Sequence, residues 1–428
     1  MAQAFFGGVH PHDMKAATNE KAIEQLAPPA VVVIPMSMHF GAPCTPLVKA
    51  GDHVKVGQKI GEFHGLGAPI HASVSGTVKA VEPRPYSMGG NITSVVIEND
   101  MQDEVSEEVQ APADPNALSV EEMVEIVKNA GIVGMGGATF PTHVKITSGI
   151  GKVNTVIING AECEPYITGD HRTMLERPEE IIGGAKFLAK MFGVDKVVIG
   201  VEDNKRNGID AMNKVIAEQK APVVVEPLRC RYPQGGEKQL CQAITGRQVP
   251  PGGLPADIGC AVFNINTTCA IYRALTTGMP VVRKIVTVSG SGVVEPKNLE
   301  CPIGTPVSSL LDACGGLKDG TYKLIAGGPM MGMAQYTADI SVAKGTGAIL
   351  AFCENEEKTV ENPQCIRCGK CVSVCPMHLE PLFMYQYASK GMVEELNDAH
   401  IMDCMECGAC SYICPARMHL TLSLIHIS

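Results

Sequence analysis

The chain has 428 residues, 45% of them hydrophobic, and a formal net charge of −10. An acidic chain with no basic run argues against nucleic acid as a partner and against a polybasic membrane anchor. The length predicts two or three packed cores, and no stretch reaches the ~18–20 apolar residues of a membrane-spanning helix. No secretory signal is recognisable, so we expect a cytoplasmic chain that is able to dock on a membrane partner.

Residues 41–98 predict a small β-rich module. Valines and isoleucines recur there between Gly and Asp turns, and the stretch Gly51–Gln58 resembles a biotinyl/lipoyl-type sandwich. A carrier domain of that type needs a lysine at its exposed hairpin, and the segment 66–72 has none. We therefore expect a structural or docking module in residues 1–100, followed by an acidic, Pro-containing linker at 101–117.

A glycine loop follows the first predicted helix. Ser119 and Glu122 form a capping box before an apolar helical face, and Gly131 ends the helix. Bare backbone amides in the loop suit a phosphate or a flavin ring edge, and Lys145 adds a cation. The loop follows a helix rather than a strand, so the Rossmann fingerprint does not apply, and a structural turn is an equally good interpretation of the loop alone. The glycines concerned are Gly134, Gly136 and Gly137.

Strands and helices alternate through the middle of the chain. The patterns predict strands at 153–158, 196–201 and 223–227, and helices at 178–192 and 205–219. This order is typical of an α/β layer with crossover helices. Acidic turns occur at Asn159–Pro165, which contains Glu162 and Glu164, and at Tyr232–Glu237. Because open sheets bind ligands beyond the carboxyl ends of their strands, we expect these turns to converge on a pocket.

Two cysteine runs carry the strongest signal. Eight of the 17 cysteines form two copies of a C-x2-C-x2-C-x3-C-P pattern, at 365–376 and 404–415. This is the spacing of bacterial proteins with two [4Fe–4S] clusters, in which the fourth cysteine of each run ligates the other cluster. Zinc sites use two ligands, a long gap and two more, and fit poorly. The predicted ligands are Cys365, Cys368, Cys371 and Cys414 for the first cluster, and Cys375, Cys404, Cys407 and Cys410 for the second. The linker at 379–400 predicts a helix packed beside the clusters.

At these residues the chain resembles the flavin-bearing, NADH-oxidising subunit of respiratory complex I. With the N-terminal motif Phe6–Pro11 and the paired cysteine runs included, it resembles the C subunits of the Rnf ferredoxin–NAD oxidoreductase complexes. The resemblance covers nearly the whole chain through five ordered motifs. It implies a multidomain α/β and α+β fold. The implied domains after the N-terminal β-sandwich are a flavin domain at 118–279, a β-grasp domain at 280–352 with a docking role, and a ferredoxin-like domain at 353–428.

The same resemblance implies the cofactor contacts. FMN would be held by Gly134, Gly136, Gly137 and Lys145, with Asn159, Glu162, Gly235, Asn264 and Thr268 around it. NAD(H) would be faced by Phe140, Glu164 and Glu237. The flavin itself performs the hydride transfer, so no catalytic side-chain acid or base is expected. An Asp and a second Glu of the complex I family are replaced here by Ala161 and Gly236, which leaves those contacts open.

The implied function is that of a peripheral NAD(H)-oxidoreducing subunit of a membrane Rnf complex. It would pass electrons between NAD(H), FMN and two [4Fe–4S] clusters in ion-translocating ferredoxin:NAD oxidoreduction, on the cytoplasmic side of the membrane. Its partners would be the membrane subunits and an iron–sulfur subunit that meets ferredoxin. Two alternatives stay open: a cobalamin reductase of a bacterial microcompartment, and a non-catalytic iron–sulfur electron-relay adaptor.

Overall fold

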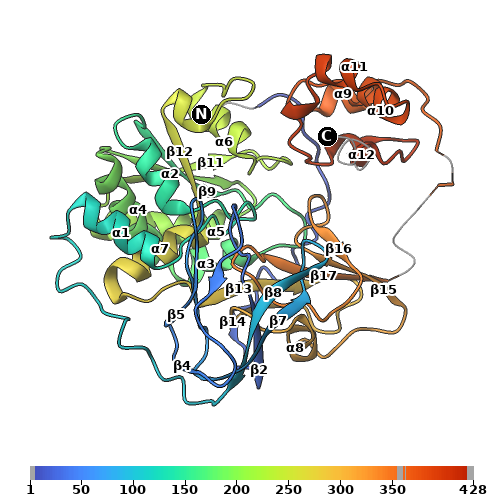
Figure 1. Ribbon diagram of the computed structural model, residues 1–428. Helices are drawn as coiled ribbons and strands as arrows, with labels where there is room; N and C mark the ends of the chain where they lie inside the picture. The colour runs from blue at the N-terminus through green and yellow to red at the C-terminus, as the bar shows by residue number, and fades with distance from the viewer. Residues whose placement is uncertain (1–4, 354–359, 362, 422–428) are drawn as a thin grey trace.

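The computed structural model describes residues 5–353, 360–361 and 363–421. In chain order it contains a β module, an α/β layer with a parallel sheet, a domain built on a six-stranded mixed sheet, and a small helical domain. Figure 1 shows the helical domain at the upper right in red. Within these described ranges, no helix is long and apolar enough to cross a membrane.

Two small sheets form the N-terminal module. One has the order β2-β8-β7-β4 and the other the order β3-β5-β6. Alternate side chains of β2, Val32 and Ile34, are completely buried, as a half-buried strand requires. The turn at 66–72 is also largely buried, and its Pro69 carbonyl lies against Gly131. The strands are β2 (Val31–Pro35), β3 (Thr45–Pro46), β4 (His53–Val54), β5 (Lys59–Glu62), β6 (Ile70–His71), β7 (Gly76–Pro85) and β8 (Asn91–Asn99).

The central layer is a four-stranded parallel sheet with the order β11-β10-β9-β12. Helix α4 has the predicted bounds, and Gly193 ends it in the left-handed region at φ 64°. The predicted strands and the helix at 205–219 are present with shifts of one or two residues. The strands are β9 (Thr155–Gly160), β10 (Val197–Glu202), β11 (Val223–Leu228) and β12 (Cys260–Asn264). The helices are α1 (Val120–Asn129), α2 (Thr142–Gly149), α3 (Gly169–Glu176), α4 (Pro178–Phe192), α5 (Arg206–Gln219), α6 (Glu237–Thr245) and α7 (Ile265–Thr277).

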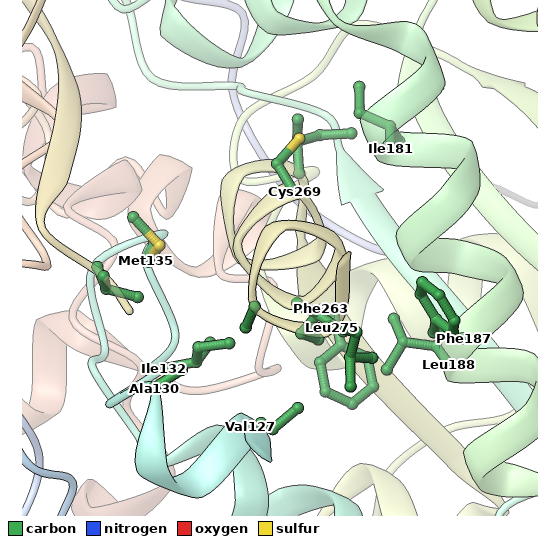
Figure 2. Close-up of a cluster of buried hydrophobic side chains, with 14 of the residues drawn as sticks. Val127, Ala130, Ile132, Met135, Ile181, Phe187, Leu188, Phe263, Cys269 and Leu275 are labelled. Atoms are coloured by element: carbon green, nitrogen blue, oxygen red, sulfur yellow. The ribbon is translucent and has the colours of Figure 1, made fainter. Parts of the chain in front are cut away.

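Helix α7 lies in the middle of the main core. Figure 2 shows side chains from α1, the glycine loop and α4 gathered around it. Val127, Ile132 and Leu188 of this group are completely buried. Met135, in the glycine loop, belongs to this core, and its backbone amide donates to Thr267 Oγ1 of α7 at 2.9 Å, so the loop is held against α7.

A six-stranded mixed sheet follows, with the order β1-β14-β13-β17-β15-β16. The N-terminal strand β1 pairs parallel with β14, so the start of the chain extends this six-stranded sheet. Helix α8 packs on this sheet through the buried side chains of Leu310 and Leu311. The elements are β1 (Glu24–Gln25), β13 (Arg283–Ser289), β14 (Lys297–Pro302), α8 (Val307–Ala313), β15 (Thr321–Ala326), β16 (Met333–Gln335) and β17 (Ala348–Cys353).

The C-terminal domain consists of short helices around the cysteine runs. The linker at 379–400 forms two helices rather than the single helix that the sequence predicts. Gly391, at φ 65°, interrupts the helical path between them, because a residue in the left-handed conformation cannot continue an α-helix. Met384 and Leu396 bury one face of each helix. The helices are α9 (Lys370–Val374), α10 (Pro381–Ser389), α11 (Val393–Asp398) and α12 (Ala409–Ile413).

Candidate functional site

The predicted turns do meet at one edge of the parallel sheet. All four strands are parallel, so their carboxyl ends lie together. The turn at 161–165 follows β9, the turn at 229–236 follows β11, and Asn264 is the last residue of β12. This is the edge at which open α/β sheets bind ligands.

The glycine loop is a tight turn with unused donors. Gly134 N donates to Phe140 O at 2.9 Å, and Thr139 N donates back to Gly134 O at 3.0 Å. Among the described residues, the backbone amides of Gly136, Gly137 and Ala138 have no hydrogen-bond partner. Gly137 has φ +125°, and a Cβ added there would meet no atom within 4 Å. Adjacent free amides on an open surface suit a phosphate group, so the loop fits the predicted role.

Lys145 and Glu237 form an ion pair beside this loop. Their Nζ and Oε1 atoms are 2.7 Å apart, and Lys145 also donates to Val262 O at 3.1 Å. Lys145 belongs to α2, and Glu237 is the first residue of α6, where a carboxylate is favoured by the helix dipole. The pair therefore connects the glycine loop region to the start of α6.

Asn159 joins the two acidic turns. Its Nδ2 donates to Gly235 O at 2.9 Å, and its Oδ1 accepts from Ala161 N at 3.2 Å. Gly235 N lies 3.3 Å from the Sγ of Cys163. The structure thus places Asn159 and Gly235, predicted as cofactor contacts, directly against one another.

Glu162 lies at the N-terminus of α3. Its carboxylate accepts from Asp170 N at 2.6 Å and from His171 N at 3.2 Å. Burial raises the pKa of Glu162 to about 7, although the nearby Lys15 ammonium acts in the opposite direction. Lys15 itself donates to the carbonyls of Glu162 and Glu164, both at 2.9 Å. Sequence reasoning missed Lys15, which lies 147 residues from its first partner.

Asn264 and Thr268 shape the start of α7. The Asn264 side chain accepts from Asn266 N at 2.9 Å as an N-cap, and its Nδ2 donates to Asp170 at 2.7 Å. Asn266 Nδ2 donates to the other oxygen of Asp170 at 2.6 Å. The completely buried Thr268 donates to Asn264 O at 3.0 Å. Sequence reasoning also missed Asp170, and its position in the first turn of α3 is the signal that could have identified it.

Glu164 and Phe140 lie on the outer parts of the site. Glu164 accepts from the amides of Met330 and Met331, at 3.1 and 3.0 Å. Its carboxylate therefore contacts the domain of the six-stranded sheet, here called the third domain. Burial raises the pKa of Glu164 to about 7, and these two hydrogen bonds act to lower it. The ring of Phe140 is partly exposed and lies 6.0 Å from the ring of Phe40, centre to centre.

Two cavities in the C-terminal domain are each lined by four cysteines. They enclose similar spaces, about 360 and 370 Å³, part of each open to solvent. Most of the other lining residues are apolar, such as Leu382 and Leu420 in the first cavity and Leu379 and Met384 in the second. The polar lining residues are Lys370 in the first cavity and Glu406 and Thr421 in the second. The four cysteines in each cavity are those that the spacing assigns to one cluster: Cys365, Cys368, Cys371 and Cys414 in one, and Cys375, Cys404, Cys407 and Cys410 in the other.

This arrangement fits iron–sulfur cubes better than zinc. A zinc ion needs all its ligands within about 2.0–2.3 Å of one point. Among the described residues, no three Cys, His, Asp or Glu side chains converge closely enough to hold one metal ion. A [4Fe–4S] cube is bound by four thiolates spread around a larger body, and that is what a cavity with four surrounding thiols can hold.

Family models match the chain in four consecutive regions. They are described as an RnfC barrel sandwich hybrid domain (residues 3–102), a Nuo51 FMN-binding domain (127–273), an SLBB domain (285–334) and a 4Fe-4S dicluster domain (358–415). The N-terminal sandwich, the flavin-type domain and the dicluster domain expected from the sequence are therefore confirmed.

Relatives of named function align with almost the whole chain. The C subunit of the Na(+)-translocating ferredoxin:NAD(+) oxidoreductase complex of Acetobacterium woodii is 46% identical over 93% of this chain and 90% of its own. The proton-translocating counterpart of Clostridium ljungdahlii is 44% identical over 94% and 88%. An NAD+-reducing [NiFe]-hydrogenase in the H2-reduced state has a similar fold, with a TM-score of 0.51 at 17% identity over 73% of this chain and 62% of that one. The chain therefore belongs to the family of C subunits of ion-translocating ferredoxin:NAD+ oxidoreductase (Rnf) complexes.

Proposed function

We propose that this chain is the peripheral NAD(H)-oxidoreducing subunit of an Rnf complex on the cytoplasmic side of the membrane. Its partners are the membrane subunits and an iron–sulfur subunit that meets ferredoxin. The names of the relatives support this proposal, and they differ in the coupled ion, so the proposal specifies none. The alternatives, a microcompartment cobalamin reductase and a non-catalytic relay, are not favoured by relatives at 44–46% identity.

The observation that carries the proposal is the contact between the flavin-type domain and one cysteine quartet. Tyr232 begins the glycine turn after β11, and its hydroxyl donates to Cys407 O at 2.7 Å. Cys407 lines the second four-cysteine cavity. A two-electron site and a one-electron carrier are therefore adjacent within one chain.

The residues of the glycine loop are proposed to hold FMN. The free amides of Gly136, Gly137 and Ala138 bind its phosphate, and Lys145 contributes a positive charge nearby. When bound, FMN exchanges a hydride with NAD(H) and single electrons with the clusters. Gly134 shapes the turn through its two hydrogen bonds. A Cβ at Gly136 would lie 3.3 Å from Asn264 Cβ, so this glycine also allows the loop to approach the start of α7.

The other predicted contacts are proposed to orient the two nucleotides. Asn159, Glu162, Gly235, Asn264 and Thr268 form a hydrogen-bonded floor that fixes the turns under the flavin. Phe140 offers a partly exposed ring to NAD(H). Glu237, which is held by its ion pair with Lys145, also faces NAD(H). Glu164 faces NAD(H) from the place where its carboxylate accepts from the amides of Met330 and Met331 in the third domain.

Cofactor content and one assay test the proposal. The chain is purified anaerobically and reconstituted with iron and sulfide, and FMN, iron and acid-labile sulfide are measured per chain. We expect one FMN, two cubes' worth of iron and sulfide, and NADH-dependent reduction of ferricyanide. Zinc in place of iron, no bound flavin, or a ferricyanide rate that NADH does not increase would each contradict it.

A further inference from the structure

The N-terminal segment Phe5–Val9, here called the N-terminal clasp, lies between the flavin-type domain and the cluster domain. Figure 1 shows the blue start of the chain passing between α6 and the red helices. Gly8 N donates to Val374 O, at the end of α9, at 2.8 Å. Val9 pairs with Tyr232 through two backbone hydrogen bonds of 2.8 and 2.9 Å. One short segment thus contacts both domains through its backbone.

Both glycines of the clasp are required by close approach. Gly7 and Gly8 have φ +73° and +80°, in the left-handed region. A Cβ at Gly7 would lie 2.6 Å from Val374 O and 2.8 Å from Cys375 O. A Cβ at Gly8 would lie 2.7 Å from Tyr232 O. These are backbone atoms that cannot rotate away, so a side chain at either position would push the domains apart.

The clasp acts on the second quartet specifically. Cys375, whose carbonyl touches Gly7, and Cys407, whose carbonyl accepts from Tyr232, both line the second cavity. Val9 and Tyr232 share one buried apolar cluster with Cys407. Tyr232 is 2% exposed, so its hydroxyl–carbonyl bond is formed away from water, where it is stronger.

Few other hydrogen bonds join the cluster domain to the rest of the described chain. Between residues 365–421 and residues 5–353 of the described chain, the bond from Gly8 to Val374 is the only backbone–backbone hydrogen bond. The Gln239 side chain reaches Pro376 O at 3.4 Å and Met377 Sδ at 3.3 Å, and Gly252 N donates to Asp403 Oδ1 at 3.3 Å, so these further polar contacts are all long. The ring of Phe6 stacks on His378 at 4.3 Å, which adds a further clasp contact to the same loop.

We propose that the N-terminal clasp, together with Tyr232, is a positioning element that fixes the second cluster against the flavin-type domain and thereby sets the rate of electron exchange between them. The inference rests on the proposed function. Glycine is required at positions 7 and 8 because the two domains meet there, and none of the clasp residues is among the predicted cofactor contacts. Displacements of about 1 Å can cost up to about 10²-fold in the rate of a step that depends on geometry.

The test uses two variants and a matched control. Gly7→Ala introduces a side chain at the domain contact. Tyr232→Phe removes the hydroxyl bond to Cys407 O together with the hydroxyl's interaction with the Glu164 side chain, and leaves the backbone of the clasp unchanged. Gly65→Ala is the control, because Gly65 has φ +72° but a Cβ there would meet nothing within 4 Å. Gly7→Ala and Gly65→Ala therefore share the backbone strain and differ only in the contact with the cluster domain.

The dithionite-reduced holoprotein is mixed anaerobically with NAD+. Flavin absorbance follows the transfer of a hydride from the reduced flavin to NAD+. Freeze-quenched EPR follows the re-oxidation of the two clusters. Their two electrons, together with one proton, restore the hydride equivalent that the flavin lost to NADH. We expect Gly7→Ala to slow the loss of the cluster signal about tenfold and Tyr232→Phe about threefold, within the range that misplacement produces. The first flavin phase of Gly7→Ala and both phases of Gly65→Ala should match the wild type.

Hydrogen exchange gives a readout that does not depend on turnover. In Gly7→Ala the amides of Gly8 and Val9 should exchange faster, while iron content stays at the wild-type level. If Gly7→Ala loses iron, Tyr232→Phe decides the question alone. If the clusters of Gly7→Ala and Tyr232→Phe are re-oxidised as fast as those of Gly65→Ala, the positioning role of the clasp is refuted. If the wild type itself shows no flavin phase, the proposed function is refuted instead.

Discussion

At the scale of single residues, the two carboxylates of the turn after β9 have different neighbours. Glu162 accepts amides from α3, eight residues away, and Glu164 accepts amides from the third domain, 166 residues away. The sequence predicts the turn and its acids, since both follow from local spacing. It does not predict their partners, because a contact across 166 residues leaves no trace in a local pattern.

Glu164 makes the stability of the domain contact depend on pH. Burial raises the pKa of Glu164 from 4.5 to about 7, so the folded protein keeps a proton that the unfolded chain releases between these values. Its contribution is therefore present below pH 4.5 and is lost as the pH rises through about 7. We expect the unfolding free energy of the wild type, relative to Glu164→Gln, to fall between about pH 4.5 and pH 7, by on the order of 1 kcal/mol for each pH unit that separates the two pKa values, and to level off above that range.

Urea unfolding at several pH values, under anaerobic conditions, measures this difference. Glu121→Gln, at an exposed position on α1, is the control and should leave the pH dependence unchanged. A wild type whose stability rises relative to Glu164→Gln across this range would contradict the assignment.

At the scale of elements, the sequence succeeds where local signals act alone. The capping box of Ser119 and Glu122 is present, with Ser119 Oγ accepting from Glu122 N at 3.2 Å. The linker at 379–400 is the opposite case, since its apolar spacing continues through a glycine and predicts one helix. The left-handed turn at Gly391, which divides the helix, is not visible in that spacing.

The packing of α4 on α7 depends on a glycine in a helix interior. A Cβ at Gly184 would lie 2.2 Å from Thr268 O, a backbone atom of the adjacent helix. We expect Gly184→Ala to lower the unfolding free energy by about 3 kcal/mol through overpacking, despite the better helix propensity of alanine.

Chemical denaturation of Gly184→Ala and Gly208→Ala checks this expectation. Gly208 lies in α5, and the atom nearest to a Cβ added there is Met174 Cβ, at an ordinary 3.4 Å. Gly208→Ala should therefore be neutral or stabilising by up to about 1 kcal/mol. Equal losses in the two variants would show that the helix contact is not the cause.

At the scale of the whole molecule, buried lysines join the domains. The completely buried Lys344 donates to Pro69 O and Gly131 O, both at 2.7 Å, and so connects the domain of the six-stranded sheet to the N-terminal module and to the flavin-type domain. Lys284 donates to Met135 O in the glycine loop at 2.8 Å. The pairing of β1 with β14 adds a further long-range contact. The sequence predicts the separate domains, but these contacts depend on how the domains assemble.

Removing Lys344 should loosen this assembly. Lys344→Met keeps a similar volume and leaves two buried carbonyls without a donor, and each costs about 1–3 kcal/mol. We expect a loss of about 2 kcal/mol in unfolding free energy at about pH 8, measured by denaturant titration. Lys49→Met, at an exposed position, should change it by less than about 0.5 kcal/mol, and an equally small effect at Lys344 would refute the connecting role.

The two cysteine quartets differ in how solvent reaches them. Cys365 and Cys368 are exposed, whereas Cys375 and Cys407 are 8% and 7% exposed. Dioxygen and chelators diffusing in from outside therefore attack the outer cube first. A cube in the second cavity, which we propose lies beside the nucleotide site, would be shielded from dioxygen by the layers that bury Cys375 and Cys407, and so would lose fewer electrons to it.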